Sequence, residues 1–133
     1  TGARFDHLPA EAPSNWPEHR HRELSDWRAK SHRDRFAARL DALFAAGEAE
    51  TLFLAADLAE TYEAFSRRYG ERVIFLERDL FDRSAAQVQH ALADLILLGA
   101  APRLLASSWS ALSEVAQNIA RPGQIVERSG VDF

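Results

Sequence analysis

The sequence of 133 residues has no cysteine and no methionine. The lack of cysteine excludes disulfides, thiolate nucleophiles and metal sites with cysteine ligands. Neither a glycine-rich phosphate or dinucleotide loop nor the G-x-S-x-G turn of serine hydrolases occurs, which argues against those enzyme classes. The longest apolar run, 91–105, is interrupted by Asp94, Pro102 and Arg103, so we expect no membrane span. No segment typical of a signal peptide is recognised, and we expect a cytoplasmic protein.

An excess of basic residues is also missing, because the formal net charge is −4. Nucleic-acid binding needs many Lys and Arg contacts to phosphates, so we expect no nucleic acid as the main partner. Apolar residues make up 47% and charged residues 27% of the chain. This composition is that of an ordinary globular domain, and the length suits one domain with its own core.

The character of the sequence changes near residue 30. Residues 1–30 contain three of the five prolines and two of the three tryptophans, and predict an arm that ends in a short helix over 17–28. From residue 31 onward, short apolar runs alternate with segments of helical periodicity. The predicted strands are 51–56, 72–76, 102–106 and 124–128. The predicted helices are 31–46, 57–69, 84–98 and 109–119.

This alternation of strands and helices predicts the fold class. We expect one α/β domain over 31–133, Rossmann-like, with a parallel sheet of about four strands and helices on both faces. Polar residues and glycines mark the expected helix ends. The expected caps are Ser31, Asp57 and Ser84, and the expected helix ends are Gly47, Gly70 and Gly99.

In an open parallel sheet, ligands bind beyond the carboxyl ends of the strands, in the loops that lead into helices. Two such loops carry polar side chains. Asp57 follows the first predicted strand and is expected either to bind a ribose or base or to cap its helix. Ser107, Ser108 and Ser110 follow the third predicted strand and are expected either to hold a phosphate at a helix N-terminus or to cap that helix.

Asp94 is the one charged residue in its apolar helix, where it shares a stripe with Gln87 and His90. An unpaired buried carboxylate is costly. We therefore expect Asp94 either to face a polar cleft or to pair with Arg83 or Arg103.

The run His19-Arg20-His21-Arg22 is expected to be either a set of donors for a phosphate or an acidic acceptor, or a solvated surface. A zinc site is not expected, because no third ligand stands at a suitable spacing from His19 and His21.

Four segments together resemble a known family. They are 53–57, 72–75, 87–98 and 105–116. Their order and spacing resemble the donor-binding half of fucosyltransferase-like GT-B glycosyltransferases, which include nodulation α1,6-fucosyltransferases and protein O-fucosyltransferases. The resemblance covers about residues 31–120 and implies a Rossmann-like domain that binds a nucleotide sugar, typically GDP-fucose, without a metal.

The resemblance also implies roles for single residues. Asp57 matches the acid at the family's A-T-D strand end, Asp94 matches the carboxylate that recognises guanine, and the turn with Ser108 and Ser110 matches the one that meets the diphosphate. Ala111 stands where the family has a second serine.

The family's H-x-R-R-x-D motif is not intact in this chain, since only Arg4 and Asp6 can be laid over it. The resemblance implies that an arginine stabilises the departing diphosphate, and the candidates are Arg4 and the arginines of 19–22. The strand before this motif and the acceptor-binding half are missing from the chain. We therefore expect inefficient sugar transfer by this chain alone.

A second hypothesis is an α/β module that has lost its ligand and serves as a partner-binding or assembly domain. Trp16 and Trp27, if exposed in the proline-rich arm, would suit docking onto another surface. The two hypotheses differ in whether the arm packs against the carboxyl edge of the sheet or projects away from it.

Overall fold

The structure is a computed structural model that describes residues 17–77 and 85–133. The helices of this part are α2 (Glu18–Lys30), α3 (Arg33–Ala45), α4 (Ala59–Tyr69), α5 (Ala85–Ala100) and α6 (Ala111–Asn118), with a 3-10 turn at Gly70–Arg72. The strands are β1 (Leu52–Phe53), β2 (Val73–Ile74), β3 (Arg103–Ala106) and β4 (Ile125–Arg128). The predicted alternation of strands and helices is confirmed.

The predicted single sheet of about four strands is wrong. Within the described residues, β1 pairs only with β2 and β3 only with β4, both in parallel. The first pair joins two residues of each strand and the second joins four. A continuous sheet needs backbone hydrogen bonds between neighbouring strands. Here Leu105 of β3 instead packs its side chain against the core formed by α3 and α4.

The core has two parts, one for each strand pair. The first is built on Ala37, Leu40 and Phe65 of α3 and α4, with side chains of β1 and β2 packed against it. The second is built on Leu104 and Ala106 of β3 with Ala116 of α6, and α5 and β4 contribute to it. Each strand pair is thus covered by the helices that precede and follow its strands.

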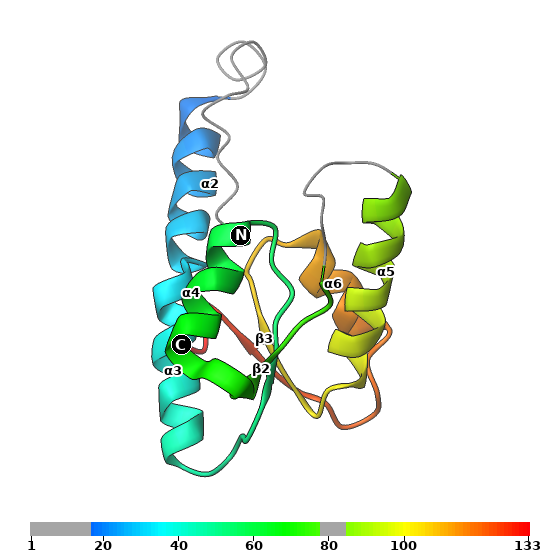
Figure 1. Ribbon diagram of the computed structural model, residues 1–133. Helices are drawn as coiled ribbons and strands as arrows, with labels where there is room; N and C mark the ends of the chain where they lie inside the picture. Colours follow the sequence, from blue (N-terminus) through cyan, green and yellow to red (C-terminus); the bar gives the residue numbers. More distant parts are fainter. Residues whose placement is uncertain (1–16, 78–84) are drawn as a thin grey trace.

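Figure 1 shows the strands between two groups of helices, with α3 and α4 on one side and α5 and α6 on the other. The strands run upward in this view, and α4, α5 and α6 begin in its upper part. Helix α2 extends above these helices. This arrangement places the loops that follow β1 and β3 at the end of the molecule where α4 and α6 begin.

The helix ends agree only partly with the predicted signals. Gly70 ends α4 with a φ of 58°, as predicted. Ser31 does not cap α3, because His32 is the N-cap and its ring accepts the N–H of Asp34 at 3.4 Å. Gly99 does not end α5, which continues to Ala100. The predicted cap at Ser84 lies outside the described residues.

Candidate functional site

The loops after β1 and β3 carry two of the predicted groups. Asp57 lies between β1 and α4, and the turn formed by residues 107–110 lies between β3 and α6. Both loops reach the edge of the molecule at which the helices begin (Figure 1). The fold therefore brings Asp57 and the serine turn to the same edge.

Hydrogen bonds within the protein organise the serine turn. Ser110 is the N-cap of α6, and its hydroxyl accepts the N–H of Ser113 at 3.4 Å. The N–H of Ser107 donates to the Ser113 hydroxyl at 3.1 Å, and the N–H of Ser108 donates to the Ser31 hydroxyl at 3.2 Å. Capping, one of the two expected roles of Ser110, is confirmed. Phosphate binding by the turn stays a prediction.

Two further backbone N–H groups belong to the same helix terminus. Ala111 and Leu112 form the first turn of α6, where backbone N–H groups have no partner within the helix. The macrodipole of the helix adds partial positive charge at this end. These two groups are suitable donors for an anionic ligand at the carboxyl edge.

Buried hydroxyls tie the serine turn to other elements. Ser31 is 1% exposed and Ser129 is 0% exposed, and their hydroxyl oxygens share a hydrogen bond of 2.9 Å. The Ser108 hydroxyl donates to the carbonyl oxygen of Ser129 at 2.6 Å. Together these contacts fasten the junction of α2 and α3 to the end of β4 and to the turn after β3.

Trp109, in the middle of the turn, has a φ of 56° in the left-handed region, which is strained for a residue with a side chain. Its ring stacks on Trp27 of α2, with centroids 6.1 Å apart, and Nζ of Lys30 lies 4.2 Å from the Trp27 centroid. The expectation that Trp27 is free for docking is therefore wrong, because its ring is used inside the molecule. Trp16 lies outside the described residues. The last turn of α2 contacts the turn after β3 through the ring pair of Trp27 and Trp109, whereas the first part of α2 extends beyond the carboxyl edge (Figure 1).

Asp57 is exposed and does not cap α4. The N-cap is Leu58, and no side chain accepts a hydrogen bond there. The predicted cap is wrong because the helix begins one residue later than the sequence signal indicates. The carboxylate is left at the surface just before the helix, where it is accessible to a ligand.

Asp94 is buried on the inner side of α5, with 3% of its surface exposed. One turn earlier, Nε2 of His90 is buried and has no hydrogen-bond partner among the described residues. Arg103, one of the two predicted partners of Asp94, contacts Glu127 and Glu48. The other predicted partner, Arg83, lies outside the described residues. The inner side of α5 thus carries a polar stripe in an otherwise apolar helix.

The basic run of residues 19–22 lies on α2. His19, Arg20 and Arg22 are exposed there. Arg20 pairs with Glu23 at 3.1 Å, and Arg22 lies 3.9 Å from Glu18. Such exposed pairs along one helix are typical of a solvated surface, so the structure agrees with that alternative. Arg4 lies outside the described residues.

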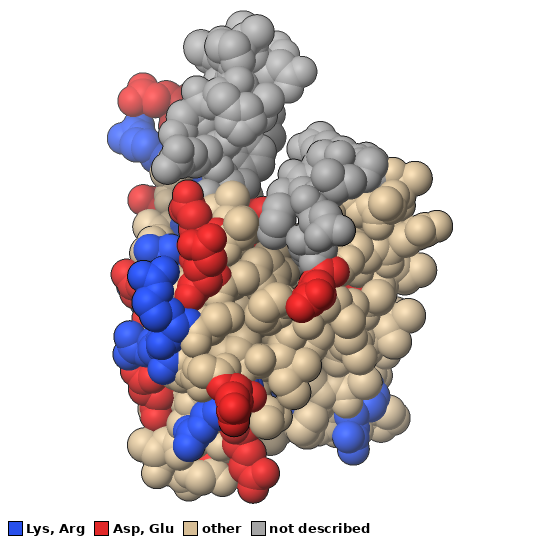
Figure 2. Space-filling view, viewed as in Figure 1, with Lys and Arg blue, Asp and Glu red and all other residues tan. Residues whose placement is uncertain are grey.

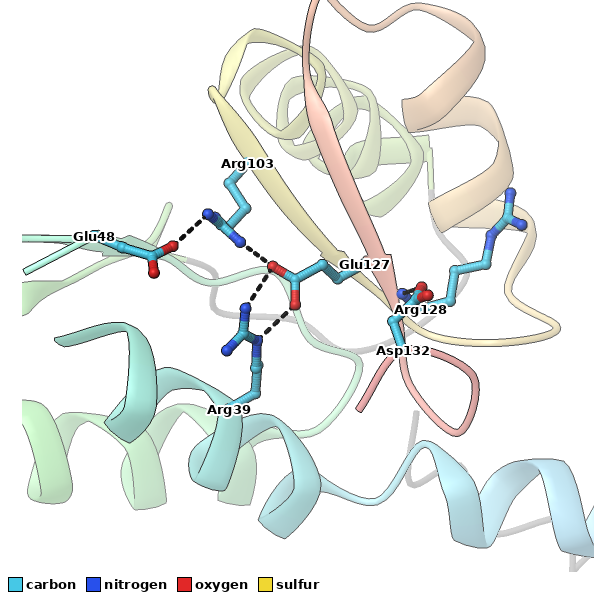
Figure 3. Close-up of polar contacts among 6 residues, drawn as sticks. All are labelled: Arg39, Glu48, Arg103, Glu127, Arg128 and Asp132. Atoms are coloured by element: carbon cyan, nitrogen blue, oxygen red, sulfur yellow. Dashed lines mark hydrogen bonds and ion pairs between the residues drawn. The ribbon is translucent and has the colours of Figure 1, made fainter. Parts of the chain in front are cut away.

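A second polar cluster links α3 to the β3–β4 pair (Figure 3). Arg39 donates two hydrogen bonds to the carboxylate of Glu127, at 2.5 and 3.0 Å, and Arg103 donates to the same carboxylate. Arg103 also contacts Glu48 at 2.7 Å. The hydrogen bond from Arg39 is the main reason that the pKa of Glu127 lies below its usual value, and Arg103 contributes, while burial acts in the opposite direction. Each of these four side chains has a partner of opposite charge, so we infer that the cluster stabilises the contact between α3 and the β3–β4 pair.

A shallow depression of about 470 Å³ lies on the outer surface between α3 and α4. Its described lining residues are Arg33, Glu60, Glu63, Ala64, Arg67 and Arg68. None of the predicted site residues is among them. Because charges of both signs line it and it is open to solvent, it does not select one kind of ligand.

Residues 17–77 and 85–133 contain no group of three or more His, Asp or Glu side chains placed to hold a metal ion. No helix of these ranges is long and apolar enough to cross a membrane.

Sequence reasoning missed the role of the tryptophans at the carboxyl edge. Nothing in the local pattern around Trp109 indicates a left-handed backbone, and the partner Trp27 is 82 positions away. The only signal in the sequence is the concentration of tryptophan in the arm, which by itself predicts a docking surface. The role of Ser129 was missed for the same reason, because its partners Ser31 and Ser108 are distant in sequence.

Comparison with models of protein families, with curated proteins and with solved structures finds no match to this chain.

Proposed function

We propose that this chain is a nucleotide-sugar-binding domain, the donor-binding half of a fucosyltransferase-like glycosyltransferase, which takes a GDP-sugar without a metal ion. The observation that carries the proposal is the position of Asp57 and the serine turn at one carboxyl edge of parallel strands. Nucleotides bind at such edges, because loops and helix N-termini converge there.

The diphosphate would be held at the start of α6. The N–H groups of Ala111 and Leu112 donate to its oxygens, and the helix dipole stabilises the negative charge. The outer face of Trp109, which is 52% exposed, provides an apolar wall beside the turn. The exposed carboxylate of Asp57 accepts hydrogen bonds from ribose hydroxyls.

Guanine recognition would fall to the polar stripe of α5. The edge of guanine presents two neighbouring N–H donors, for which a carboxylate such as that of Asp94 is a suitable acceptor. The buried Nε2 of His90 is a further polar group on the same side of the helix. A buried polar atom without a partner is costly in the free protein, so a ligand that supplies a hydrogen bond would be favoured.

Sugar transfer requires more than this domain. The departing diphosphate would be stabilised electrostatically by an arginine, and Arg4, Arg20 and Arg22 are the candidates. An acceptor-binding half would complete the catalytic cleft. We therefore expect nucleotide binding by this chain and little transfer.

Calorimetric titration with GDP, and with ADP and UDP as controls, tests the proposal. The expected result is binding of GDP at least about tenfold tighter than that of ADP or UDP, which corresponds to a free-energy difference of about 1.4 kcal/mol. The variant Asp94→Asn keeps the size of the side chain and should lose this preference. Asp26→Asn, at an exposed position of α2, is the matched control and should bind as the parent does.

If the folded protein binds none of the three nucleotides, that result contradicts the proposal. Equal binding of GDP by the parent and by Asp94→Asn would contradict the role of Asp94. In the first case the second candidate, a partner-binding module, would stand. The specific observation in its favour is the exposed apolar surface of α5.

A further inference from the structure

Contacts of its last turn join helix α2 to the domain. Trp27 stacks on Trp109, and the side chain of Lys30 fills the space beside Gly130. None of the α2 side chains that the structure describes is buried. The first part of the helix extends beyond the carboxyl edge, and charged groups lie beside it (Figures 1 and 2). A helix of 13 residues is marginally stable in water on its own, so we expect the stability of α2 to depend on the contacts of its last turn.

The residue that follows α2 is held inside the domain by other bonds. Ser31 is 1% exposed, and its hydroxyl shares a hydrogen bond of 2.9 Å with the hydroxyl of Ser129. The same hydroxyl accepts the N–H of Ser108 at 3.2 Å. These bonds involve no residue of α2. Ser31 therefore stays in place when α2 detaches.

Trp109 has a backbone conformation that its own side chain disfavours. Its φ of 56° is the one positive value outside glycine among the described residues. Hydrogen bonds hold the residues on both sides of it, since the Ser108 hydroxyl donates to the carbonyl of Ser129 and Ser110 caps α6. Stacking of two aromatic rings stabilises a protein by about as much as one left-handed residue destabilises it. The contact with Trp27 is therefore large enough to hold Trp109 in this conformation.

We propose that α2 docks reversibly and that its docking sets the backbone conformation of the serine turn. In the docked form, the ring of Trp27 holds Trp109 in the left-handed region. In the undocked form, the ring pair is broken, α2 loses its helix and the φ of Trp109 becomes negative, while the other helices and the strands stay folded. Elements with few buried side chains open in this way at a lower free energy than the whole domain.

The consequence for ligand binding rests on the proposed function. Ala111 and Leu112, the proposed phosphate donors, begin two positions after Trp109, whose exposed face is the proposed wall beside them. The docked form fixes this ring against Trp27, whereas the undocked form leaves it free to rotate. Immobilising a side chain on binding lowers affinity, so we expect the docked form to bind a GDP-sugar more tightly. By linkage, a bound nucleotide then favours docking of α2.

Three variants separate the ring contact from the helix that carries it. Alanine is a better helix former than tryptophan, so a loss of helix in Trp27→Ala comes from the missing contact with Trp109. Arg20→Ala is the matched control on the same helix, because Arg20 is exposed and pairs with Glu23 of α2. Trp27→Phe keeps an aromatic ring and should restore part of the docking.

Amide hydrogen exchange by NMR follows each helix separately, and a chain of 14.9 kDa is small enough for this method. In Trp27→Ala, the amides of α2 should exchange about tenfold faster than in the parent, because the ring pair and its buried surface are lost. The amides of α3 and α6 should keep their rates. The ¹³C chemical shifts of Trp109 should leave the range of a left-handed residue. Arg20→Ala should match the parent in each measurement.

Unchanged exchange of α2 and unchanged shifts of Trp109 in Trp27→Ala would overturn the proposal. Equal acceleration of exchange in α2 and α3 would also overturn it, because α2 would then open only with the whole domain. Variants in which every helix loses its protection count as this second result.

Titration of the same proteins with GDP tests the consequence for the site. The parent and Arg20→Ala should bind GDP about two- to tenfold more tightly than Trp27→Ala, the range expected for immobilising one side chain. Equal affinity in the parent and Trp27→Ala would overturn the link between docking and binding. If the parent binds no GDP, the proposed function fails, and the exchange rates and chemical shifts still decide whether α2 docks reversibly.

Discussion

Gly130 lies where the end of β4 meets the end of α2, and an alanine there would have to displace the helix. Its φ is 74°, in the region that side chains disfavour. An added Cβ would lie 2.6 Å from Cβ of Lys30 and 2.9 Å from its Cγ and Cδ atoms. Cβ of Lys30 is fixed to the helix backbone and cannot rotate away. We therefore expect Gly130→Ala to weaken the docking of α2.

The magnitude follows from two separate costs. A left-handed backbone costs a residue with a side chain about 1–2 kcal/mol. Forcing an extra carbon into a packed contact costs about 1–3 kcal/mol. The sum for Gly130→Ala is about 2–5 kcal/mol of unfolding free energy, which is a large share of the about 5–15 kcal/mol of a typical domain.

Gly123→Ala separates the two costs. Gly123 has a φ of 82°, but an added Cβ would meet nothing within 4 Å. This variant should lose only the backbone term, about 1–2 kcal/mol. Urea unfolding of the parent and both variants measures the difference. Tryptophan fluorescence of the folded Gly130→Ala variant should also differ from that of the folded parent, because Lys30 lies over Trp27 and Trp27 stacks on Trp109.

Equal losses of stability in Gly130→Ala and Gly123→Ala would refute the reasoning. That result would mean that α2 does not press against Gly130 in solution, and that only the backbone conformation matters at both positions.

Three further predictions concern single contacts. Hydrogen bonds from Arg39 lower the pKa of Glu127, so its carboxylate stabilises the fold above its unfolded pKa near 4.5, and this contribution is lost as the pH falls through the folded pKa. Urea unfolding at pH 7 and pH 3 should therefore show a smaller difference in unfolding free energy between the two pH values in Glu127→Gln than in the parent. Ser129→Ala removes the hydroxyl bonded to Ser31 and should cost about 1–2 kcal/mol by urea unfolding, and an effect below about 0.5 kcal/mol, as for an exposed residue, would contradict it. Burial, with the hydrogen bond to Asp41, raises the pKa of Tyr69 to about 12; titration of tyrosinate absorbance should show this late step, and Asp41→Asn should move it to lower pH.

Periodicity determined much of the secondary structure. The repeat of Phe36, Leu40 and Leu43 predicted α3. The short apolar runs 51–56 and 72–76 predicted strands that alternate with helices, and the structure contains this alternation. These are local properties, since helical spacing and turn residues act within a few positions of each other. Strand pairing is not local. The sequence contains four strand signals, but two separate pairs and one continuous sheet have the same local pattern.

The candidate site also depends partly on local sequence patterns and partly on contacts between distant residues. Asp57, Asp94 and the serine turn were selected from the sequence because their residue types are chemically suitable and the fold class places such loops at one edge. Whether a serine caps, binds within the protein or faces a ligand depends on its neighbours in space. Ser110 caps α6, whereas the N–H of Ser108 bonds to Ser31, which is 77 positions away.

The sequence by itself determined the alternation of strands and helices, most helix positions and the chemical types available for a site, because these depend on short-range patterns. Only the tertiary structure decided that the last turn of α2 contacts the turn after β3 through Trp27 and Trp109, that Glu127 joins α3 to the β3–β4 pair, and that the outer side of α5 is left uncovered. These outcomes depend on contacts between distant residues. Helical periodicity does not specify which of two apolar faces of α5 is buried; packing against β3 and α6 does.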